Sequence, residues 1–274
     1  MNVKQRKSAY FVPALEKGLD ILEALSRVTV PQTLADLSRL CRRSRTEIFR
    51  MVDALERREY IVRDPVSGGY QLTLKIFQLA HTHSPIDQLL RASYFPMRDL
   101  ANQLQESCHL CVMSGEFLLV IAEAESPSPV RLSVAVGHRV APLTTASGRL
   151  LLAMLEEPAR DTALRKDGNF QSMSPMQRNV LRKELIRARK TGFCLASSAY
   201  RTGLDVSCLV GSPGLGVTAA LGIPFIAGGP NEGKESELVP AIRKYANRIT
   251  HALGLNSKPT ESLGAKGKSS STMR

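Results

Sequence analysis

Residues 33–63, TLADLSRLCRRSRTEIFRMVDALERREYIVR, decide the fold of the N-terminal part of this chain. Their apolar residues recur at helical spacing in two short segments, first Leu34, Leu37 and Leu40, then Ile48, Met51, Val52 and Leu55. The turn between the segments is basic, and the second helix turns Thr46, Arg50, Asp53 and Arg57 away from its apolar stripe. This pattern is typical of a helix-turn-helix that binds DNA, although amphipathic helix pairs also occur in helical domains with merely solvated charged faces.

The residues on either side favour the DNA-binding interpretation. A β-rich run at residues 60–63 leads into the turn-rich stretch 64–69 and a second short strand at residues 70–72. A helix-turn-helix followed by a hairpin is a winged helix. Upstream, a third helix that closes the core is predicted from Leu15, Leu19, Ile21, Leu22 and Leu25.

Length and composition limit the classes of protein. The 274 residues predict one large or two ordinary domains, and the net charge of +12 favours nucleic acid or another polyanion as partner. No stretch reaches the length of a membrane span and the N-terminus has no apolar signal region, so we expect a cytoplasmic protein without a membrane partner. Five cysteines at irregular spacing argue against a disulfide framework.

We expect four segments along the chain. Residues 1–11 form a basic N-terminal arm, 12–82 the winged helix-turn-helix domain with a linker helix, 83–255 a second domain, and 256–274 a Ser/Lys/Gly-rich disordered tail. In the second domain, strands are predicted at residues 108–113, 117–122, 130–136, 193–197, 206–210 and 216–226, and helices at 89–105, 148–155, 175–191 and 235–253. Hairpin strands with grouped helices indicate an α+β domain on an antiparallel sheet.

Together these segments resemble the IclR family of bacterial transcriptional regulators. The matching stretches are PALEKGLDILEAL, SRTEIFRMVDALERREYI and RDPVSGGYQLTLK, then QESCHLCVMSGEFLLVIAEAESPSPVRLSVAVGHRVAPLTTASGRLLLA, TGFCLASSAYRTGLDVSCLV and VTAALGIPFI. The resemblance covers residues 12 to about 254 and rests on their order and spacing. It implies an N-terminal winged helix and a C-terminal GAF-like effector-binding domain. It further implies a homodimer or homotetramer that represses or activates transcription when a small carboxylate or aromatic acid binds.

This chain departs from the family pattern at three places. Cys41 stands where the turn between the helices usually has glycine, and Gly69 stands where a basic residue is common at the tip of the wing. Residues 196–198, Ala-Ser-Ser, replace a stretch in which some members have an acidic residue. The first two departures affect how DNA is docked, and the third affects the polar contacts of the effector.

The helix at about residues 45–57 is expected to enter the major groove of double-stranded DNA. Arg50 is the best candidate for reading guanine, and Glu47 could accept from cytosine. Arg43, Arg45 and Thr46 lie near the helix N-terminus and are expected to contact phosphate. The complete set of predicted DNA-binding residues is Arg43, Ser44, Arg45, Thr46, Glu47, Phe49 and Arg50.

The candidate effector site begins at residues 143–148, Leu-Thr-Thr-Ala-Ser-Gly, which run into a helix. Hydroxyl side chains there supply a helix cap, and the first free amides of the helix would favour an anion such as a ligand carboxylate. A plain helix cap explains the same residues, but the resemblance implies that the effector lies against them. The predicted effector-binding residues are Thr145, Ala146, Ser147 and Gly148, then Asp205, Ser207 and Cys208 on the opposite wall, with Leu132 and Val134 as apolar lining.

Other motifs carry no chemistry. Cys108 and Cys111 have C-x-x-C spacing, but residues three apart on a strand point to opposite faces, so we expect buried apolar cysteines and no metal. No cofactor and no catalytic set is predicted. The function expected is an effector-controlled, sequence-specific transcriptional regulator. The alternatives are a small-molecule sensor or enzyme whose N-terminal domain only mediates assembly, and a DNA-bending protein without an effector.

Overall fold

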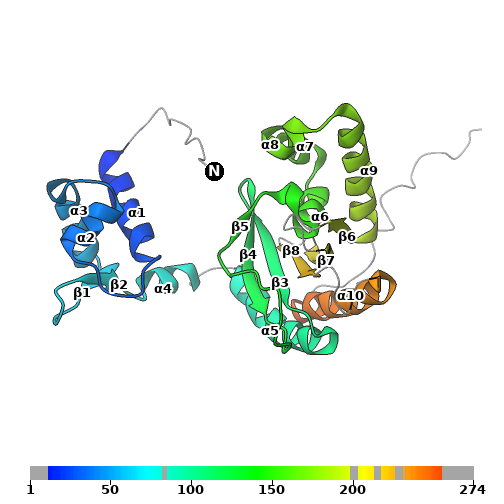
Figure 1. The fold of residues 1–274 in the computed structure, drawn as a ribbon, viewed down its shortest axis with the longest axis horizontal. Helices are drawn as coiled ribbons and strands as arrows, with labels where there is room; N and C mark the ends of the chain where they lie inside the picture. Colours follow the sequence, from blue (N-terminus) through cyan, green and yellow to red (C-terminus); the bar gives the residue numbers. More distant parts are fainter. Residues whose placement is uncertain are drawn as a thin grey trace, which may run out of the picture. The chain divides into compact units, whose positions relative to one another are not determined.

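The computed structural model describes residues 12–81, 85–197, 203–212, 217–225, 231 and 233–254. The chain divides into two compact units between Ser84 and Pro85, and Figure 1 shows the elements of each. The arm expected at residues 1–11 and the tail expected at residues 256–274 lie outside the described residues.

The N-terminal unit is a three-helix bundle with a short hairpin. Its elements are α1 (Pro13–Leu25), α2 (Leu34–Leu40), α3 (Arg45–Arg57), β1 (Ile61–Arg63), β2 (Tyr70–Leu72) and α4 (Lys75–His81). The small core consists of the fully buried side chains of Ile21, Leu25, Leu37, Ile48, Val52 and Ile61. Met51 and Leu55 pack against it, so the apolar stripe predicted for α3 is confirmed.

Side-chain caps explain where α2 and α3 begin. Thr33 and Asp36 form a reciprocal capping box at the start of α2, and Ser44 and Glu47 form a second at the start of α3. In the turn between the helices, Cys41 has right-handed backbone geometry, while Arg42 takes the left-handed conformation with φ 53°. The turn therefore needs no glycine at Cys41.

The hairpin of β1 and β2 has the form of a wing. Its strands pair antiparallel from Ile61↔Leu72 to Arg63↔Tyr70, and the carboxylate of Asp64 accepts from the amides of Val66 and Ser67 in the turn. A Cβ on Gly69 would lie 2.9 Å from the backbone carbon of Pro31. Gly69 thus packs against the loop between α1 and α2, which leaves no room for a basic side chain at this position.

Two leucines that were expected to close the core from α1 do not do so, and one leucine of the apolar stripe predicted for α2 is also exposed. Leu15, Leu19 and Leu40 are 59%, 47% and 48% exposed. The core needs only one narrow stripe from each helix, so these leucines remain at the surface of the unit.

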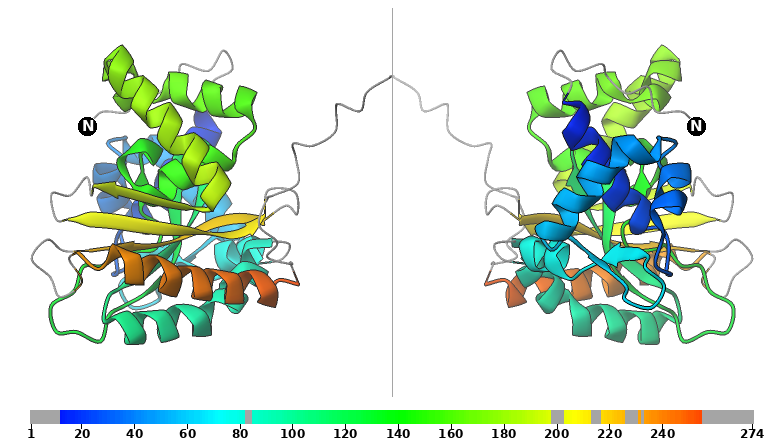
Figure 2. Two further views of the ribbon diagram at one scale, coloured as in Figure 1. Left: turned by 90° about the vertical axis from the view of Figure 1, so that its right-hand side faces the viewer. Right: turned by 90° about the vertical axis from the view of Figure 1, so that its left-hand side faces the viewer.

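The C-terminal unit contains a six-stranded antiparallel sheet in the order β5-β4-β3-β8-β7-β6. The strands are β3 (Cys108–Ser114), β4 (Phe117–Ala124), β5 (Arg139–Val140), β6 (Phe193–Ser197), β7 (Leu204–Ser212) and β8 (Val217–Pro224). The helices are α5 (Pro85–Leu104), η1 (Pro142–Thr144, a 3-10 turn), α6 (Ala146–Met154), α7 (Glu157–Lys166), α8 (Gly168–Ser172), α9 (Pro175–Thr191) and α10 (Glu235–Ala252). Figure 2 shows α5 and α10 on one side of the sheet and α6 to α9 on the other.

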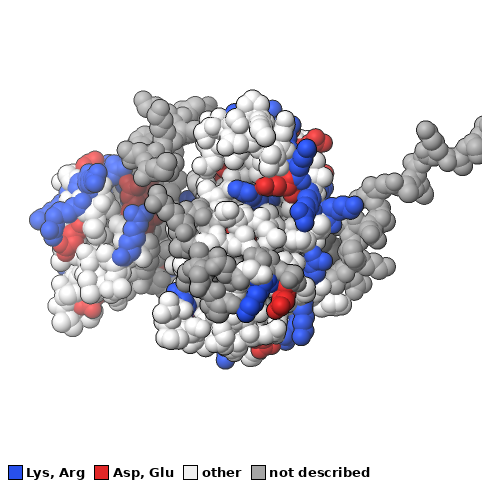
Figure 3. All heavy atoms as spheres, turned by 45° about the vertical axis from the view of Figure 1, so that its right-hand side comes forward, with Lys and Arg blue, Asp and Glu red and all other residues white. Residues whose placement is uncertain are grey.

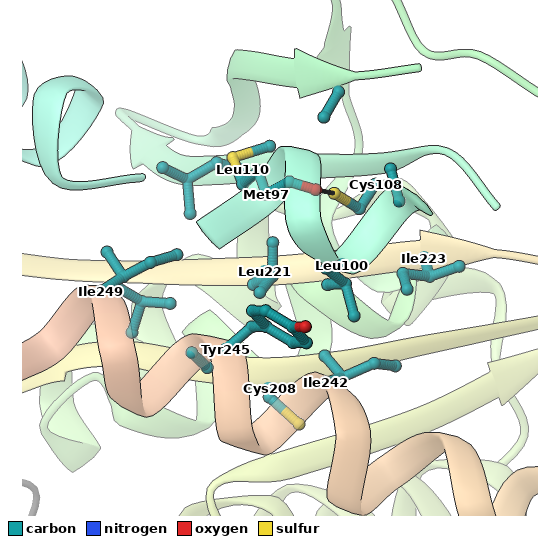
Figure 4. Close-up of a cluster of buried hydrophobic side chains, with 14 of the residues drawn as sticks. Met97, Leu100, Cys108, Leu110, Cys208, Leu221, Ile223, Ile242, Tyr245 and Ile249 are labelled. Carbon is teal, nitrogen blue, oxygen red and sulfur yellow. Dashed lines mark hydrogen bonds between the residues drawn. The ribbon is translucent and has the colours of Figure 1, made fainter. Parts of the chain in front are cut away.

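Two hydrophobic cores lie on the two faces of this sheet. Figure 4 shows the core beneath α5 and α10, where Leu100, Tyr245 and Ile249 meet strand residues such as Leu221. On the opposite face, α6 and α9 bury Leu150, Leu151 and Leu185. Strand β3 contributes Cys108 to the first core and Cys111 to the second, so these two thiols do point to opposite faces.

Two predictions for the second unit need correction or extension. Residues 130–136 form no strand; the strand that follows β4 and pairs with its outer edge is the short β5. Helices α7 and α8 were not predicted, because each buries only one residue, Leu164 and Phe170 respectively.

Among the helices of the described chain, none has both the length and the apolar character that a membrane span requires.

Candidate functional sites

The outer face of α3 is polar and open to solvent. Arg45, Thr46 and Arg50 are exposed, and Phe49 is 58% exposed beside them. The described residues provide no ion-pair partner for Arg45 or Arg50, so their guanidinium groups are available to an external anion. The face therefore has the donors that reading a base edge or a phosphate requires.

The other predicted DNA-binding residues hold the unit together. Arg43 donates from Nη2 to Oδ2 of Asp20 at 2.7 Å, which ties the turn to α1. Glu47 accepts from the backbone and hydroxyl of Ser44 and lies 3.1 Å from Nζ of Lys17. These hydrogen bonds, with the charge of Lys17, lower the pKa of Glu47 to about 2. Reading cytosine with Glu47 would require these contacts to break.

Basic and acidic side chains are interspersed on the surface of the N-terminal unit, which lies on the left in Figure 3. Part of the basic charge is neutralised within the unit, since Arg57 pairs with Asp53 at 3.1 Å and Arg39 pairs with Asp36. Within the described residues Arg45 and Arg50 of α3 have no such partner, so their charge remains available.

The C-terminal unit contains a cavity of about 270 Å³ against one face of its sheet. Most of its wall is apolar and comes from β3, β4, β5 and the segment 132–135, and the polar residues come from five places in the chain. The lining residues are His109, Cys111, Leu118, Val120, Leu132, Ser133, Val134, Ala135, His138, Val140, Thr144, Thr145, Asp205 and Pro224. The segment is held by the side chain of Glu123, whose Oε1 accepts from the amide of Val134 at 2.9 Å.

Asp205 on β7 joins this cavity to the first turn of α6. Its Oδ2 accepts from the amide of Ala146 at 2.8 Å, and the residue is only 4% exposed. Burial raises the pKa of Asp205 to about 6, while the Ala146 hydrogen bond and the charge of Arg149 act in the opposite direction. Its other oxygen, Oδ1, is buried and has no hydrogen-bond partner among the described residues.

A chain of buried polar side chains runs behind the wall. The hydroxyl of Ser147 donates to Ser207 at 3.1 Å, and Ser207 donates to the carbonyl of Leu221 at 3.3 Å. Because the Ser147 proton is used in this way, Nε2 of His109, 3.4 Å away, must be the donor to Ser147. Burial lowers the pKa of His109 to about 4, so the ring is neutral near pH 7.

The predicted effector-site residues divide into three groups. Leu132, Val134, Thr145 and Asp205 line the cavity. A second group supports the wall from behind and consists of Ala146, Ser147, Gly148 and Ser207. The amide of Gly148, for example, donates to Oγ1 of Thr145. Gly148 also leaves no space for a Cβ, which would lie 2.1 Å from the carbonyl oxygen of Pro142.

Cys208 was assigned to the wrong face. It lies 1% exposed in the core beneath α10, as Figure 4 shows, and its thiol faces the carbonyl of Val239 at 4.0 Å. Neighbouring residues on a strand point to opposite sides of the sheet, so Asp205 and Ser207 share one face and Cys208 takes the other.

Sequence reasoning missed both histidines of the cavity wall. His109 was noticed only as part of the C-x-x-C motif, and no spacing marked His138, which lies in the connection from residues 132–135 to β5. The one signal for His109 in the sequence was strand alternation: His109 and Cys111 are two residues apart on β3 and therefore point to the same face of the sheet. Within the described residues, no group of three His, Cys, Asp or Glu side chains is placed to hold a metal ion.

Comparison with known proteins agrees with this architecture. Residues 14–65 match the IclR helix-turn-helix domain, and residues 85–251 match the domain described as bacterial transcriptional regulator IclR C-terminal. The HTH-type transcriptional repressor AllR of Escherichia coli (strain K12) is 25% identical over 252 residues, which is 90% of this chain and 92% of AllR. The HTH-type transcriptional regulator XynR of the same strain is 23% identical over 248 residues, covering 89% and 98%.

Solved structures share the fold. An IclR homolog from Microbacterium hydrocarbonoxydans, complexed with 4-hydroxybenzoate, superposes with a TM-score of 0.72 at 21% identity, covering 88% of this chain and 99% of that one. The Thermotoga maritima IclR gives a TM-score of 0.66 at 20% identity, with 88% and 98% covered. Since both domain types match in order over most of the chain, this protein belongs to the IclR family of bacterial transcriptional regulators, which are DNA-binding proteins and not enzymes.

Proposed function

We propose that α3 reads operator DNA and that the cavity beside Asp205 binds the small-molecule effector that controls this reading. The observation that supports the DNA contact is the exposed guanidinium of Arg50 on the polar face of α3, which has no ion-pair partner among the described residues. Arg45 and Thr46, at the start of the helix, are the proposed phosphate contacts. A transcriptional regulator acts where the DNA lies, so we place the protein in the cytoplasm.

The test of the DNA contact is fluorescence anisotropy on the DNA upstream of the protein's own gene and on a scrambled duplex, at several salt concentrations. A specific regulator is expected to prefer the upstream DNA by about 10³-fold or more, with affinity falling steeply as salt rises. Replacing Arg50 by Ala should cost about 1–3 kcal/mol on the specific site and relax the sequence preference.

Arg57→Ala is the matched control, because Arg57 is an exposed arginine of the same helix that already pairs with Asp53. It should weaken binding less than Arg50→Ala does. Equal losses for Arg50→Ala on specific and scrambled DNA would rule out its role in base reading.

The proposed effector site is supported by the mainly apolar wall of the cavity and its few polar groups, the usual composition of a small-molecule site. The Microbacterium hydrocarbonoxydans homolog, a protein of the same fold, was solved with 4-hydroxybenzoate bound. A panel of small carboxylic and aromatic acids, with their neutral analogues, should contain molecules that shift the DNA-binding curve.

Ala135→Trp tests whether such a shift arises in the cavity. Ala135 is exposed at the cavity wall, so an indole there should fill the space without disturbing either core. A ligand that acts equally on the Ala135→Trp variant binds elsewhere, and this result would reject the cavity as the effector site.

We further propose that the chain self-associates. Leu15 and Leu19 on α1 and Leu79 on α4 are apolar and about half exposed, which suits an interface between N-terminal units in a homodimer or homotetramer. Light scattering should give a mass of two or four chains, and Leu15→Glu with Leu19→Glu should lower it. The effector would then bind one geometry of the dimer more tightly and raise the population of that geometry. This shift would change the spacing between the two recognition helices.

A further inference from the structure

The amides at the start of α6 are already used by the protein itself. The amide of Ala146 donates to Oδ2 of Asp205 at 2.8 Å, and the amide of Gly148 donates to Oγ1 of Thr145 at 3.1 Å. A carboxylate side chain therefore occupies the place where a helix N-terminus would otherwise attract a ligand anion. A ligand carboxylate brought to the same turn would lie beside the carboxylate of Asp205, which is electrostatically unfavourable in a buried site.

The second oxygen of Asp205 requires a donor. Asp205 lines the cavity, and its Oδ1 is buried without a hydrogen-bond partner among the described residues. A buried carboxylate oxygen without a donor is costly, and native proteins rarely leave one unless a ligand or another group completes the site. Few charged groups surround the carboxyl of Asp205. The charge of Arg149, on α6, favours its ionised form, and the ring of His109, on β3, is neutral.

The rest of the wall limits the body of the ligand. Leu118, Val120, Leu132, Val134 and Val140 provide an apolar surface around most of the cavity. Its volume of about 270 Å³ lies just below the usual range for sites of drug-sized ligands, about 300–1,000 Å³. A compact molecule with a single ring or a branched aliphatic body fits this space.

We infer that the cavity selects a compact, mainly apolar ligand that presents a hydroxyl or amide N–H donor to Oδ1 of Asp205, and that it disfavours a ligand with a carboxylate at this position. The inference rests on the proposed function, because it names the ligand chemistry of the proposed effector site. It differs from the sequence-based expectation of a carboxylate bound at the α6 N-terminus.

Pairs of nearly isosteric amides and acids test this directly. The probes are benzamide with benzoate, phenylacetamide with phenylacetate, and isobutyramide with isobutyrate, titrated calorimetrically into the full-length protein at fixed salt near neutral pH. A hydrogen bond to a charged group is strong enough that each amide that binds should bind about tenfold or more tightly than its acid.

Asp205→Asn should reverse the preference. The oxygen of the Asn side chain must accept from the Ala146 amide, so its NH2 group would take the place of Oδ1 and would offer a donor in place of an acceptor. The acids should then bind more tightly than the amides. Asp161→Asn on α7 is the matched control, since Asp161 is not part of the cavity wall, and it should retain the wild-type preference.

The outcomes separate this inference from the proposed function. Wild-type protein that prefers the acids, or an amide preference that survives in Asp205→Asn, would overturn the inference while leaving the cavity as an effector site. Binding that Ala135→Trp does not weaken, or no binding of any of the six probes, would overturn both.

Discussion

Replacing Asp205 by Asn should make the protein more stable near neutral pH, although it removes a proposed ligand contact. Burial raises the pKa of Asp205 from an ordinary 3.8 to about 6. Between these two pH values the folded protein holds a proton that the unfolded chain has released. The ionised carboxyl therefore lowers the free energy of unfolding as pH rises through this window, and the full cost is present above about pH 6.

The magnitude follows from the size of the shift. About two pKa units at 1.36 kcal/mol each correspond to about 3 kcal/mol. Asn is a neutral isostere that can still accept from the Ala146 amide, so the variant should recover most of this amount near pH 7.5. At about pH 4 the wild-type carboxyl is protonated in the folded state and only partly ionised in the unfolded state, so the gain should fall below about 1 kcal/mol.

Urea denaturation followed by circular dichroism measures both values, at one protein concentration so that any association affects each variant equally. Asp161→Asn serves as the control and should change the free energy of unfolding by less than about 0.5 kcal/mol at either pH. A loss of stability near pH 7.5, or a gain of the same size at about pH 4, would show that desolvation of Asp205 is not the source of its raised pKa.

Three further changes test the supporting wall. Gly222→Ala should destabilise the protein by about 1–3 kcal/mol, because the new Cβ would lie 2.4 Å from Oγ of Ser147. Gly168→Ala is the control: a Cβ there meets no atom within 4 Å, so its thermal unfolding should be nearly unchanged. Similar losses for both variants would contradict the packing argument. His109→Gln should abolish a pH dependence of the free energy of unfolding. Burial lowers the pKa of His109 to about 4 from an ordinary 6.5, so the neutral ring contributes its full stability above about pH 6.5. About 3 kcal/mol of the free energy of unfolding is then lost as pH falls to about 4. Matching pH slopes for wild type and this variant in urea titrations would refute it. Thr145→Ala should lose the cap on the Gly148 amide and about 1 kcal/mol, and Thr145→Ser should retain most of it; equal denaturation midpoints for the two variants would argue against the cap.

The sequence predicted the N-terminal unit well because helix period, caps and turn residues agree there. Ile48 and Val52 are both buried at the positions that the apolar stripe indicates, and Ser44 caps the helix that contains them. The errors at Leu15 and Leu19 have a different origin, since periodicity shows which residues share a face but not whether the unit has anything to cover that face.

The cavity was harder to predict because it depends on contacts between distant segments. Val130, Leu132, Val134 and Val136 alternate as in a strand, but Leu132 and Val134 face a cavity and Val130 and Val136 are 80% and 60% exposed. No alternation distinguishes an apolar cavity wall from the face of a sheet. The hydrogen bond from Ala146 to Asp205 joins residues 59 positions apart, and only the folded structure brings them together.

Helix α5 is long enough that a small tilt at one end would become a large displacement at the other. Its 20 residues extend for about 30 Å, from the division between the two units to a point a few residues before His109 in the cavity wall. A tilt of about 10° at the β3 end would move its first turn by about 5 Å, close to one turn of a helix. Pro96 removes one backbone hydrogen bond partway along this helix, so its stiffness is lowest in the middle. A change of angle at the β3 end of α5 would therefore be felt chiefly at its first turn.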